Sequence, residues 1–351
     1  MSEFLDDIRS QEGVLRHLLE AYRGRLRPQL DLAADLLDRH PDRPVLVVGM
    51  GSSLFAGASL AGLLGRRSRI VVVEDAGELL HYRLESAARA GAIVAISQSG
   101  RSIETIRVVE ALRGRNECPI LALVNDEASP VAAAADVVLP MLAGSEGAIS
   151  TKTYTASLAA LIALGDVRSS GPIGSEELDR AVDAGGRLAT DESVGRAAAD
   201  HLGDARALIV LGRGPAVGVA AYGALAIKEA AAMPAEAMSG GAFRHGPIEL
   251  VGGDLGVIVL APAGRTTDLL VGIATQTAEL GTPTWLITDA GHASTMAAPA
   301  NLLVSPLLPD VAEDVAPLAL AVPLQLMAAA LADRVGRSGT TVVASKVTDR
   351  E

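Results

Sequence analysis

The sequence predicts an α/β protein of two tandem doubly wound parallel-sheet domains, with an N-terminal helical arm and a C-terminal tail. Three observations support this fold class. The chain has 351 residues, well above the roughly 150 of a usual domain. Short apolar runs alternate with helical stretches, and a glycine-containing turn recurs in the two halves. The many apolar residues (49%) include few aromatics (2%), which suits close packing of helices on sheets.

The N-terminal arm, residues 1–43, has a helical pattern. Leucines cluster at Leu15, Leu18 and Leu19, and again after Pro28, with spacings compatible with 3.6 residues per turn. A proline inside a helix removes a hydrogen bond and clashes with the preceding turn. We therefore expect Pro28 to interrupt the arm.

Parallel strands are expected after the arm, because strands covered on both faces are continuous apolar runs. The first predicted domain, residues 44–168, contains five such runs: Val45–Val48, Ile70–Val73, Ile93–Ile96, Ile120–Val124 and Val137–Leu139. The second, residues 193–334, contains four: Leu208–Leu211, Leu255–Leu260, Thr284–Ile287 and Leu302–Val304. A polar, acid-rich segment from Ser169 to Glu192 marks the boundary, and residues 335–351 form the tail.

A short repeated motif relates the two halves. The segments Val47–Gly51 and Val210–Gly214 both place Gly-X-Gly at the end of a strand and before a helix, which predicts two related α/β units. The first copy is also similar to a dinucleotide-binding fingerprint. Its third glycine, however, is Gly57 rather than a residue three positions after Gly51. We therefore disfavour nicotinamide binding.

Composition limits the classes of partner. A formal net charge of −12 disfavours nucleic acid or an anionic membrane as the main partner. The longest apolar stretch, Ala316–Ala332, contains Pro317, Pro323 and Gln325 and is shorter than the ~20 residues of a membrane span, so we interpret it as a buried helix. The start has neither a basic leader nor an apolar signal core, which predicts a cytoplasmic protein. Cys118 is the single cysteine, so no intramolecular disulfide or cysteine-based metal site is expected.

Hydroxyl-rich turns follow three predicted elements of the first half. The sharpest is Ile96–Ser102, between a buried strand and a helical pattern, where serines and helix-end N–H groups can bind a phosphate. A serine-rich helix cap is the alternative interpretation. The segments Gly49–Ser53 and Gly144–Lys152 are similar in composition. Three such turns in one half indicate a polyol or phosphate site.

A candidate acid/base pair lies in the second half. Tyr222, Ala226 and Glu229 are spaced by four and three residues, so they share one face of a predicted helix. His245 follows in a glycine-rich loop before Gly246. We expect it to extend outward, where it can complete an acid/base pair with the glutamate. A structural or solvated histidine is the alternative.

Six segments together resemble the sugar-isomerase (SIS) domain family: Ile96–Gly100, Gly147–Lys152, Leu211–Gly214, Ile227–Glu229, Arg244–Pro247 and Ser345–Thr348. The resemblance runs from about residue 44 to the C-terminus. It is greatest to the two-domain isomerase half of glucosamine-6-phosphate synthase, to the single-chain amino-sugar-phosphate deaminases and to the fructosamine-6-phosphate deglycases.

The resemblance implies roles for individual residues. The phosphate of the sugar would bind to Ser53, Ser97, Gln98, Ser99 and Ser102, and the sugar itself would be lined by Ala148 and Ser150. Glu229 matches the base that moves a proton between C1 and C2, His245 matches the histidine that opens the ring, and Lys346 matches the lysine beside the first carbons. The resemblance also implies a homodimer in which His245 acts in trans at the neighbour's site.

Two departures from the synthase bear on the reaction. Tyr222 and Ala226 stand where the synthase carries a glutamate and a lysine, and the glutaminase domain with its nucleophilic cysteine has no counterpart in this sequence. We therefore expect the breakdown of an amino-sugar phosphate to ammonia and a ketose phosphate, without metal or cofactor. A fructosamine-6-phosphate deglycase and a non-catalytic sugar-phosphate sensor remain as alternatives, although the acidic arm is not a helix-turn-helix domain of the kind such sensors carry.

Overall fold

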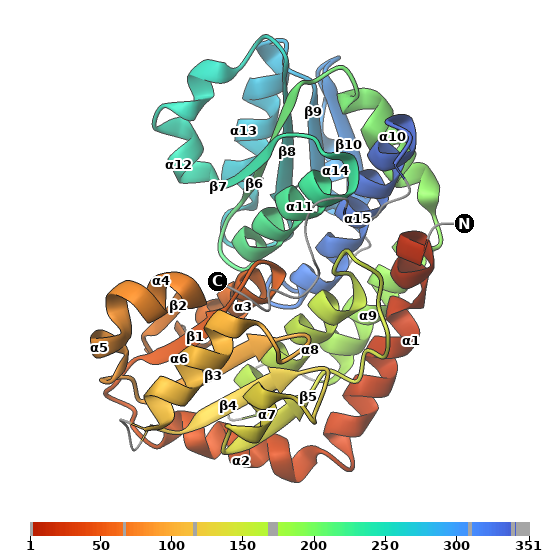
Figure 1. Cartoon of the computed structure of the whole chain (residues 1–351). Coiled ribbons are helices and arrows are strands. Elements are labelled where there is room, and N and C mark those ends of the chain that lie inside the picture. Colours follow the sequence, from red (N-terminus) through yellow and green to blue (C-terminus); the bar gives the residue numbers. More distant parts are fainter. Residues whose placement is uncertain are drawn as a thin grey trace. The chain divides into compact units, whose positions relative to one another are not determined.

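The computed structural model describes residues 3–65, 68–114, 118–167, 175–307, 311–337 and 341. The chain forms two compact units, each built on one parallel sheet (Figure 1). The first-sheet unit contains the described residues within 13–146 and 152–172, and the second-sheet unit contains those within 1–12, 147–151 and 173–342. The predicted α/β class with two tandem parallel sheets is confirmed.

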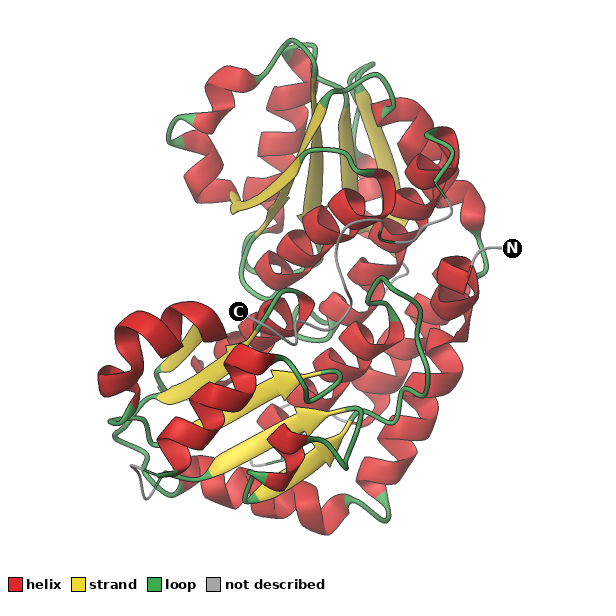
Figure 2. Ribbon diagram, viewed as in Figure 1, coloured by secondary structure: helices red, strands yellow, loops and turns green. Residues whose placement is uncertain are grey.

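The first-sheet unit has five parallel strands in the order β2-β1-β3-β4-β5. Their bounds are β1 (Val45–Gly49), β2 (Val71–Asp75), β3 (Ala92–Ser97), β4 (Ile120–Val124) and β5 (Val137–Pro140). The helices are the second half of α1 (Glu3–Arg23), α2 (Arg27–Asp38), α3 (Ser52–Gly65), α4 (Ala76–Glu78), η1 (Leu79–Arg83), α5 (Leu84–Ala87), α6 (Ile103–Arg113), α7 (Pro130–Ala133) and α8 (Lys152–Asp166). Figure 2 shows helices on both faces of this sheet, which explains why its central strands are buried throughout.

The second-sheet unit repeats this topology, with the order β10-β9-β8-β6-β7. Its strands are β6 (Ala207–Gly212), β7 (Ala235–Ser239), β8 (Leu255–Ala261), β9 (Thr284–Asp289) and β10 (Leu302–Leu307). Its helices are α9 (Ser175–Ala189), α10 (Glu192–Leu202), α11 (Ala216–Ala231), α12 (Gly240–Arg244), η2 (Pro247–Leu250), α13 (Thr267–Glu279), α14 (Ala290–Thr295) and α15 (Ala316–Arg334). The equivalent turns after β1 and β6 share a left-handed glycine, Gly51 (φ +52°) and Gly214 (φ +53°).

Strand β7 is the one strand of the described chain that the apolar runs did not predict. It is an edge strand paired only with β6, and its residues are half-buried or exposed. Because one side of β7 faces no further strand, its sequence needs no continuous apolar run. The segment from Ser169 to Glu192, chosen as the domain boundary, contains the helix α9.

The arm and the apolar C-terminal stretch are helical, as the sequence predicts. Helix α2 begins at Arg27 with Pro28 in its first turn, where a missing N–H breaks no intrahelical bond.

Helix α15 is long and apolar enough for a membrane span, but 89% of its apolar segment is buried inside the protein. Gly195 lets α10 approach it closely, because a Cβ there would lie 2.4 Å from the carbonyl carbon of Leu326. The interpretation of this stretch as a buried helix is confirmed.

Candidate functional site

The first sheet has a switch point between β1 and β3, from which its strands continue in opposite directions. Ligands of open α/β sheets bind at the carboxyl end of such a point. Ser53 lies in the first turn of α3, directly after β1, and Ser97 is the last residue of the paired strand β3. Gln98, Ser99 and Ser102 follow in the next turn. The structure therefore places the five predicted phosphate residues in two adjacent turns.

The serine hydroxyls in the turn between β3 and α6 can donate hydrogen bonds to a ligand. The N–H of Gly100 donates to Ser97 Oγ (3.1 Å) and the N–H of Arg101 donates to Ser99 Oγ (3.1 Å), so both hydroxyls act as acceptors within the turn. Each hydroxyl keeps its own proton for a further acceptor. Ser102 precedes α6 without capping it through its side chain, and the first N–H groups of a helix attract anions. The turn can therefore bind a phosphate.

Gly100 fixes the shape of this turn. Its φ of +61° lies in the left-handed region, and a Cβ at this position would lie 1.9 Å from Ser129 Oγ. Ser129 is buried and caps α7 by accepting from the N–H of Ala132 (3.4 Å). A glycine is needed here both for the backbone conformation and for the contact with α7.

Replacing Gly100 by alanine is expected to destabilise the protein by more than the strain of a left-handed φ alone would. Gly144→Ala is the matched control, because Gly144 has a φ of +69° and a methyl group there would meet no other atom within 4 Å. We expect Gly100→Ala to lower the free energy of unfolding by about 1–3 kcal/mol more than the control, from overpacking. Urea denaturation of both variants measures the difference, and equal losses would contradict the packing argument.

Arg101 adds little net positive charge to the turn. Its guanidinium pairs with Asp126 at 2.9 Å, and this hydrogen bond holds the pKa of Asp126 below its usual value. Both side chains are exposed, so the ion pair contributes little to stability. Binding of an anion here would depend mainly on hydroxyls and backbone N–H groups.

The second sheet has an equivalent switch point, between β6 and β8, but a side chain of the protein occupies it. The N–H of Arg265 donates to Glu313 Oε2 at 3.5 Å, and a Cβ on Gly264 would lie 2.4 Å from the carboxyl carbon of Glu313. The carboxylate also lies close to Gly214. A resident negative charge disfavours a second anion, so the first switch point is the better phosphate site.

The candidate acid/base residues belong to the second-sheet unit. Helix α11 presents Tyr222 and Ala226, which are buried, and Glu229, which is half-buried near its C-terminal end. This confirms the predicted helix. His245 is exposed and follows α12 directly, as expected for an outward-facing residue. The structure thus leaves both proposed catalytic side chains accessible.

The segment before His245, expected to be a glycine-rich loop, is helical. Gly240 and Gly241 begin α12, where Ser239 caps the helix by accepting from the N–H of Ala242 (3.1 Å). A Cβ on Gly240 would lie 3.0 Å from the side chain of Leu270. These glycines serve close packing, and the glycine beside His245 that has an unusual conformation is Gly246, at φ +128°.

The predicted sugar-lining residues Ala148 and Ser150 are half-buried and group with the second-sheet unit. The carbonyl of Ser150 accepts a hydrogen bond from the hydroxyl of Tyr222 (2.6 Å). The sequence analysis did not identify Asp7 and Gln325. Asp7 binds this segment directly, and Gln325 binds it through Tyr222. The position of Gln325 within an apolar helix was the signal that could have identified it. Lys346 lies outside the described residues.

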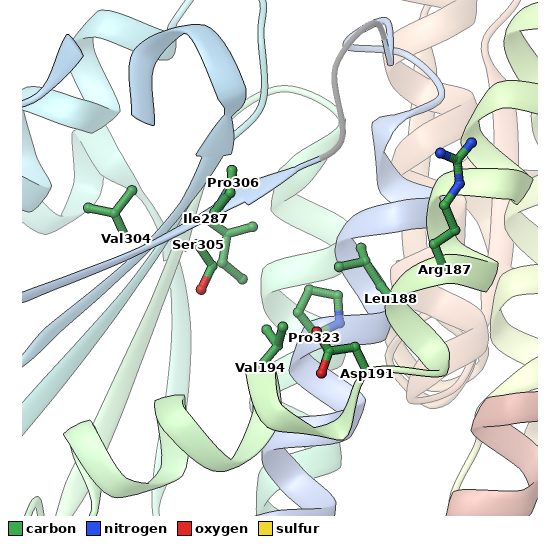
Figure 3. A pocket seen from close by; sticks show the side chains of 9 residues that line it. All are labelled: Arg187, Leu188, Asp191, Val194, Ile287, Val304, Ser305, Pro306 and Pro323. Atoms are coloured by element: carbon green, nitrogen blue, oxygen red, sulfur yellow. The ribbon is translucent and has the colours of Figure 1, made fainter. Parts of the chain in front are cut away.

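A cavity of about 410 Å³ in the second-sheet unit contains none of these residues. Figure 3 shows apolar side chains such as Leu188, Val194 and Pro323 around it, with the guanidinium of Arg187 pointing away from them. Its one acidic lining residue, Asp191, already accepts from the N–H of Ser193 (3.1 Å). An apolar cavity of this kind does not suit a phosphosugar. The candidate site is therefore identified by the chemistry of its side chains rather than by the volume of a cavity.

Comparison with known proteins links both halves to one family. Residues 40–165 and 201–332 each match the SIS domain. A glutamine–fructose-6-phosphate aminotransferase (isomerizing) of Rhizobium leguminosarum bv. viciae is 35% identical over 301 residues, which are 80% of this chain and 48% of the relative. A relative of the same name from Rhizobium meliloti is 31% identical over 338 residues, 92% of this chain and 54% of the relative. The chain thus spans about half the length of these relatives.

Solved structures share the fold at lower identity. The C-terminal domain of glucosamine-fructose-6-phosphate aminotransferase from Francisella tularensis superposes with a TM-score of 0.80 at 22% identity, covering 96% of this chain and 97% of that one. Tagatose-6-phosphate ketose/aldose isomerase from Escherichia coli gives 0.84 at 21%, with 98% and 96% covered. Glucosamine-6-phosphate deaminase from Thermotoga maritima gives 0.75 at 18%, with 99% of each chain covered.

Proposed function

This chain belongs to the SIS domain family, and we propose that it is a sugar-phosphate isomerase and deaminase that converts an amino-sugar phosphate to a ketose phosphate and ammonia. The observation that supports the proposal most is the cluster of serine hydroxyls and the N-terminus of α6 at the first switch point. The relatives named above are named for fructose-6-phosphate, and one structural neighbour for glucosamine-6-phosphate.

The proposed reaction needs a base, a ring-opening group and water. His245 assists opening of the sugar ring to expose the C1 aldehyde. The carboxylate of Glu229 removes the proton from C2 while the aldehyde oxygen gains a proton, giving an enolamine. The carboxyl group then returns its proton to C1 and the nitrogen loses one, so that a C2 imine forms. Water adds to this imine, the C–N bond breaks, and ammonia leaves with a ketone at C2. The carbonyl and imine of the substrate make the transferred proton acidic, while Lys346 stays near C1.

The one cysteine of this sequence does not have the properties of an activated nucleophile. Cys118 is buried, and burial raises the pKa of its thiol to about 11. A nucleophilic cysteine needs the opposite shift, toward a thiolate at neutral pH. These 351 residues therefore supply no activated thiol for taking ammonia from glutamine.

Ser102→Ala is expected to weaken phosphosugar binding without weakening the fold. The hydroxyl of Ser102 makes no cap bond to α6, so its removal leaves the helix end unchanged. If it donates to the phosphate, its loss lowers affinity by about 1–3 kcal/mol, roughly 5- to 150-fold. Calorimetric titration with glucosamine-6-phosphate and with inorganic phosphate measures the change.

Thr266→Ala is the matched control for this experiment. Thr266 holds the equivalent position at the second switch point, before α13, and it also makes no side-chain cap bond. The control should keep wild-type affinity, because Glu313 already occupies that turn. Wild-type affinity in Ser102→Ala itself would remove this hydroxyl from the phosphate site.

A fructosamine-6-phosphate deglycase is the second candidate, and the environment of Tyr222 favours it. The hydroxyl of Tyr222 is engaged by Ser150 and Gln325, so this face of α11 lacks the pair of ring-handling side chains that the synthase carries. Incubating the purified chain with aldosamine phosphates and fructosamine phosphates separates the two activities. A deaminase releases ammonia and a deglycase releases a free amino acid, whereas a sugar-phosphate sensor binds without releasing either.

The proposed enzyme acts in the cytoplasm as a homodimer with a phosphorylated sugar as its ligand. Dimerisation is proposed because the exposed His245 can then serve the site of the neighbouring chain. Neither nucleic acid nor a membrane is proposed as a partner, in keeping with the formal net charge of −12.

A further inference from the structure

A chain of buried polar side chains in the second-sheet unit ends on the 147–151 loop, and we infer that it positions this loop for the sugar. Ala148 and Ser150 of the loop are the proposed sugar-lining residues, so the catalytic part of this inference rests on the proposed function. The members of the chain are Gln11, Tyr222 and Gln325, from α1, α11 and α15, and Asp7 of α1 binds the loop separately.

Tyr222 connects the loop to α15. Its hydroxyl donates to the carbonyl of Ser150 at 2.6 Å and accepts from Nε2 of Gln325 at 2.8 Å. Tyr222 is 1% exposed and Gln325 is 0% exposed, so water does not compete for these bonds. Both functions of the phenol, donor and acceptor, are used.

The two glutamines complete the chain without leaving a donor unused. Nε2 of Gln11 donates to Oε1 of Gln325 (2.7 Å) and to the carbonyl of Ile8 (3.0 Å). Nε2 of Gln325 donates to Oε1 of Gln11 (3.2 Å) as well as to Tyr222. A buried network with every donor matched favours a single arrangement. It also explains why the apolar helix α15 contains a fully buried amide.

Asp7 holds the other end of the loop. Its Oδ2 accepts from the N–H of Gly147 at 2.8 Å, and the residue is 6% exposed. Asp7 lies four residues before Gln11, and therefore on the same face of α1. The loop is thus fixed at its first residue by Asp7 and at its fourth by Tyr222.

This arrangement defines what Tyr222 does. The resemblance places it where the synthase has a glutamate, yet its hydroxyl is committed to the backbone of the loop. It acts on the sugar through the placement of Ser150 and is therefore a positioning residue. Removing the hydroxyl should loosen the loop while leaving the phosphate turn of the first-sheet unit unchanged.

Tyr222→Phe tests the inference in the full chain. Tyr22→Phe is the matched control, because Tyr22 is also buried and donates to a backbone carbonyl, that of Pro140 (2.9 Å), in the first-sheet unit. Hydrogen exchange without ligand should become about 10-fold faster in peptides covering residues 147–151 of Tyr222→Phe, and not in the control. Equal exchange in the two variants overturns the inference.

Kinetics with glucosamine-6-phosphate test the effect on the sugar. Tyr222→Phe should lower kcat/KM by about 10- to 100-fold through misplacement of the loop, with an unchanged inhibition constant for inorganic phosphate. A loosened loop with wild-type kcat/KM would overturn the positioning role. If the wild-type chain turns over no phosphosugar, the proposed function fails, while the exchange experiment still decides whether the network holds the loop.

Discussion

Glu229→Gln is expected to lower turnover of an amino-sugar phosphate by about 10²- to 10⁴-fold, the usual contribution of a positioned base. The amide keeps the size of the side chain but cannot accept the proton from C2. Glu229 is half-buried near the end of α11, so the substitution should leave the fold and phosphate affinity unchanged. Steady-state kinetics together with the binding constant for inorganic phosphate separate catalysis from binding.

Glu236→Gln is the control for this change. Glu236 lies on the edge strand β7, seven residues further along the chain, and is exposed. The same chemical substitution there should leave turnover unchanged. Near-normal turnover in Glu229→Gln would show that another group transfers the proton.

His245→Asn is also expected to abolish turnover, and mixing it with Glu229→Gln should restore part of the activity. If His245 serves the site of the neighbouring chain, a heterodimer of the two variants has one site with both native residues and one site with neither. Up to about half of wild-type activity per heterodimer should return, by the symmetry of a two-fold dimer. Turnover of the mixture and of each variant alone measures the rescue.

Exchange of subunits must accompany this experiment, because variants that do not mix would mimic a negative result. A pull-down of untagged Glu229→Gln by tagged His245→Asn demonstrates the exchange. With exchange demonstrated, a mixture as inactive as its components would mean that both residues act within one chain. The exposure of His245 beside α12 is compatible with either arrangement.

Local patterns in the sequence predicted most of the fold. The central strands β1, β3 and β4 were recognisable because both of their faces are buried, which leaves a continuous apolar run. Strand β7 was missed because its sequence contains no continuous apolar run: Glu236 interrupts it and is exposed. The left-handed conformations of Gly51 and Gly214 show that the repeated Gly-X-Gly motif forms equivalent turns in the two units.

The candidate site was predictable only as far as its residues are close in sequence. The turn from Ser97 to Ser102 is local, and its position at a strand end followed from the apolar run before it. The occupation of the second switch point by Glu313 depends on residues about 50 positions apart. The bond between Tyr222 and Gln325 joins helices 103 residues apart. Such pairs depend on tertiary packing, which no local pattern encodes.

The reaction of the purified chain with glucosamine-6-phosphate in deuterated water tests the proposed function most directly. A deaminase forms a ketose phosphate and ammonia in equal amounts. Deuterium should appear at C1 of the product wherever the proton on Glu229 exchanges with solvent before its return. Proton and phosphorus NMR follow both products, with Glu229→Gln as the blank. An intact substrate, or a free amino acid released only from fructosamine phosphates, would contradict the proposed deaminase.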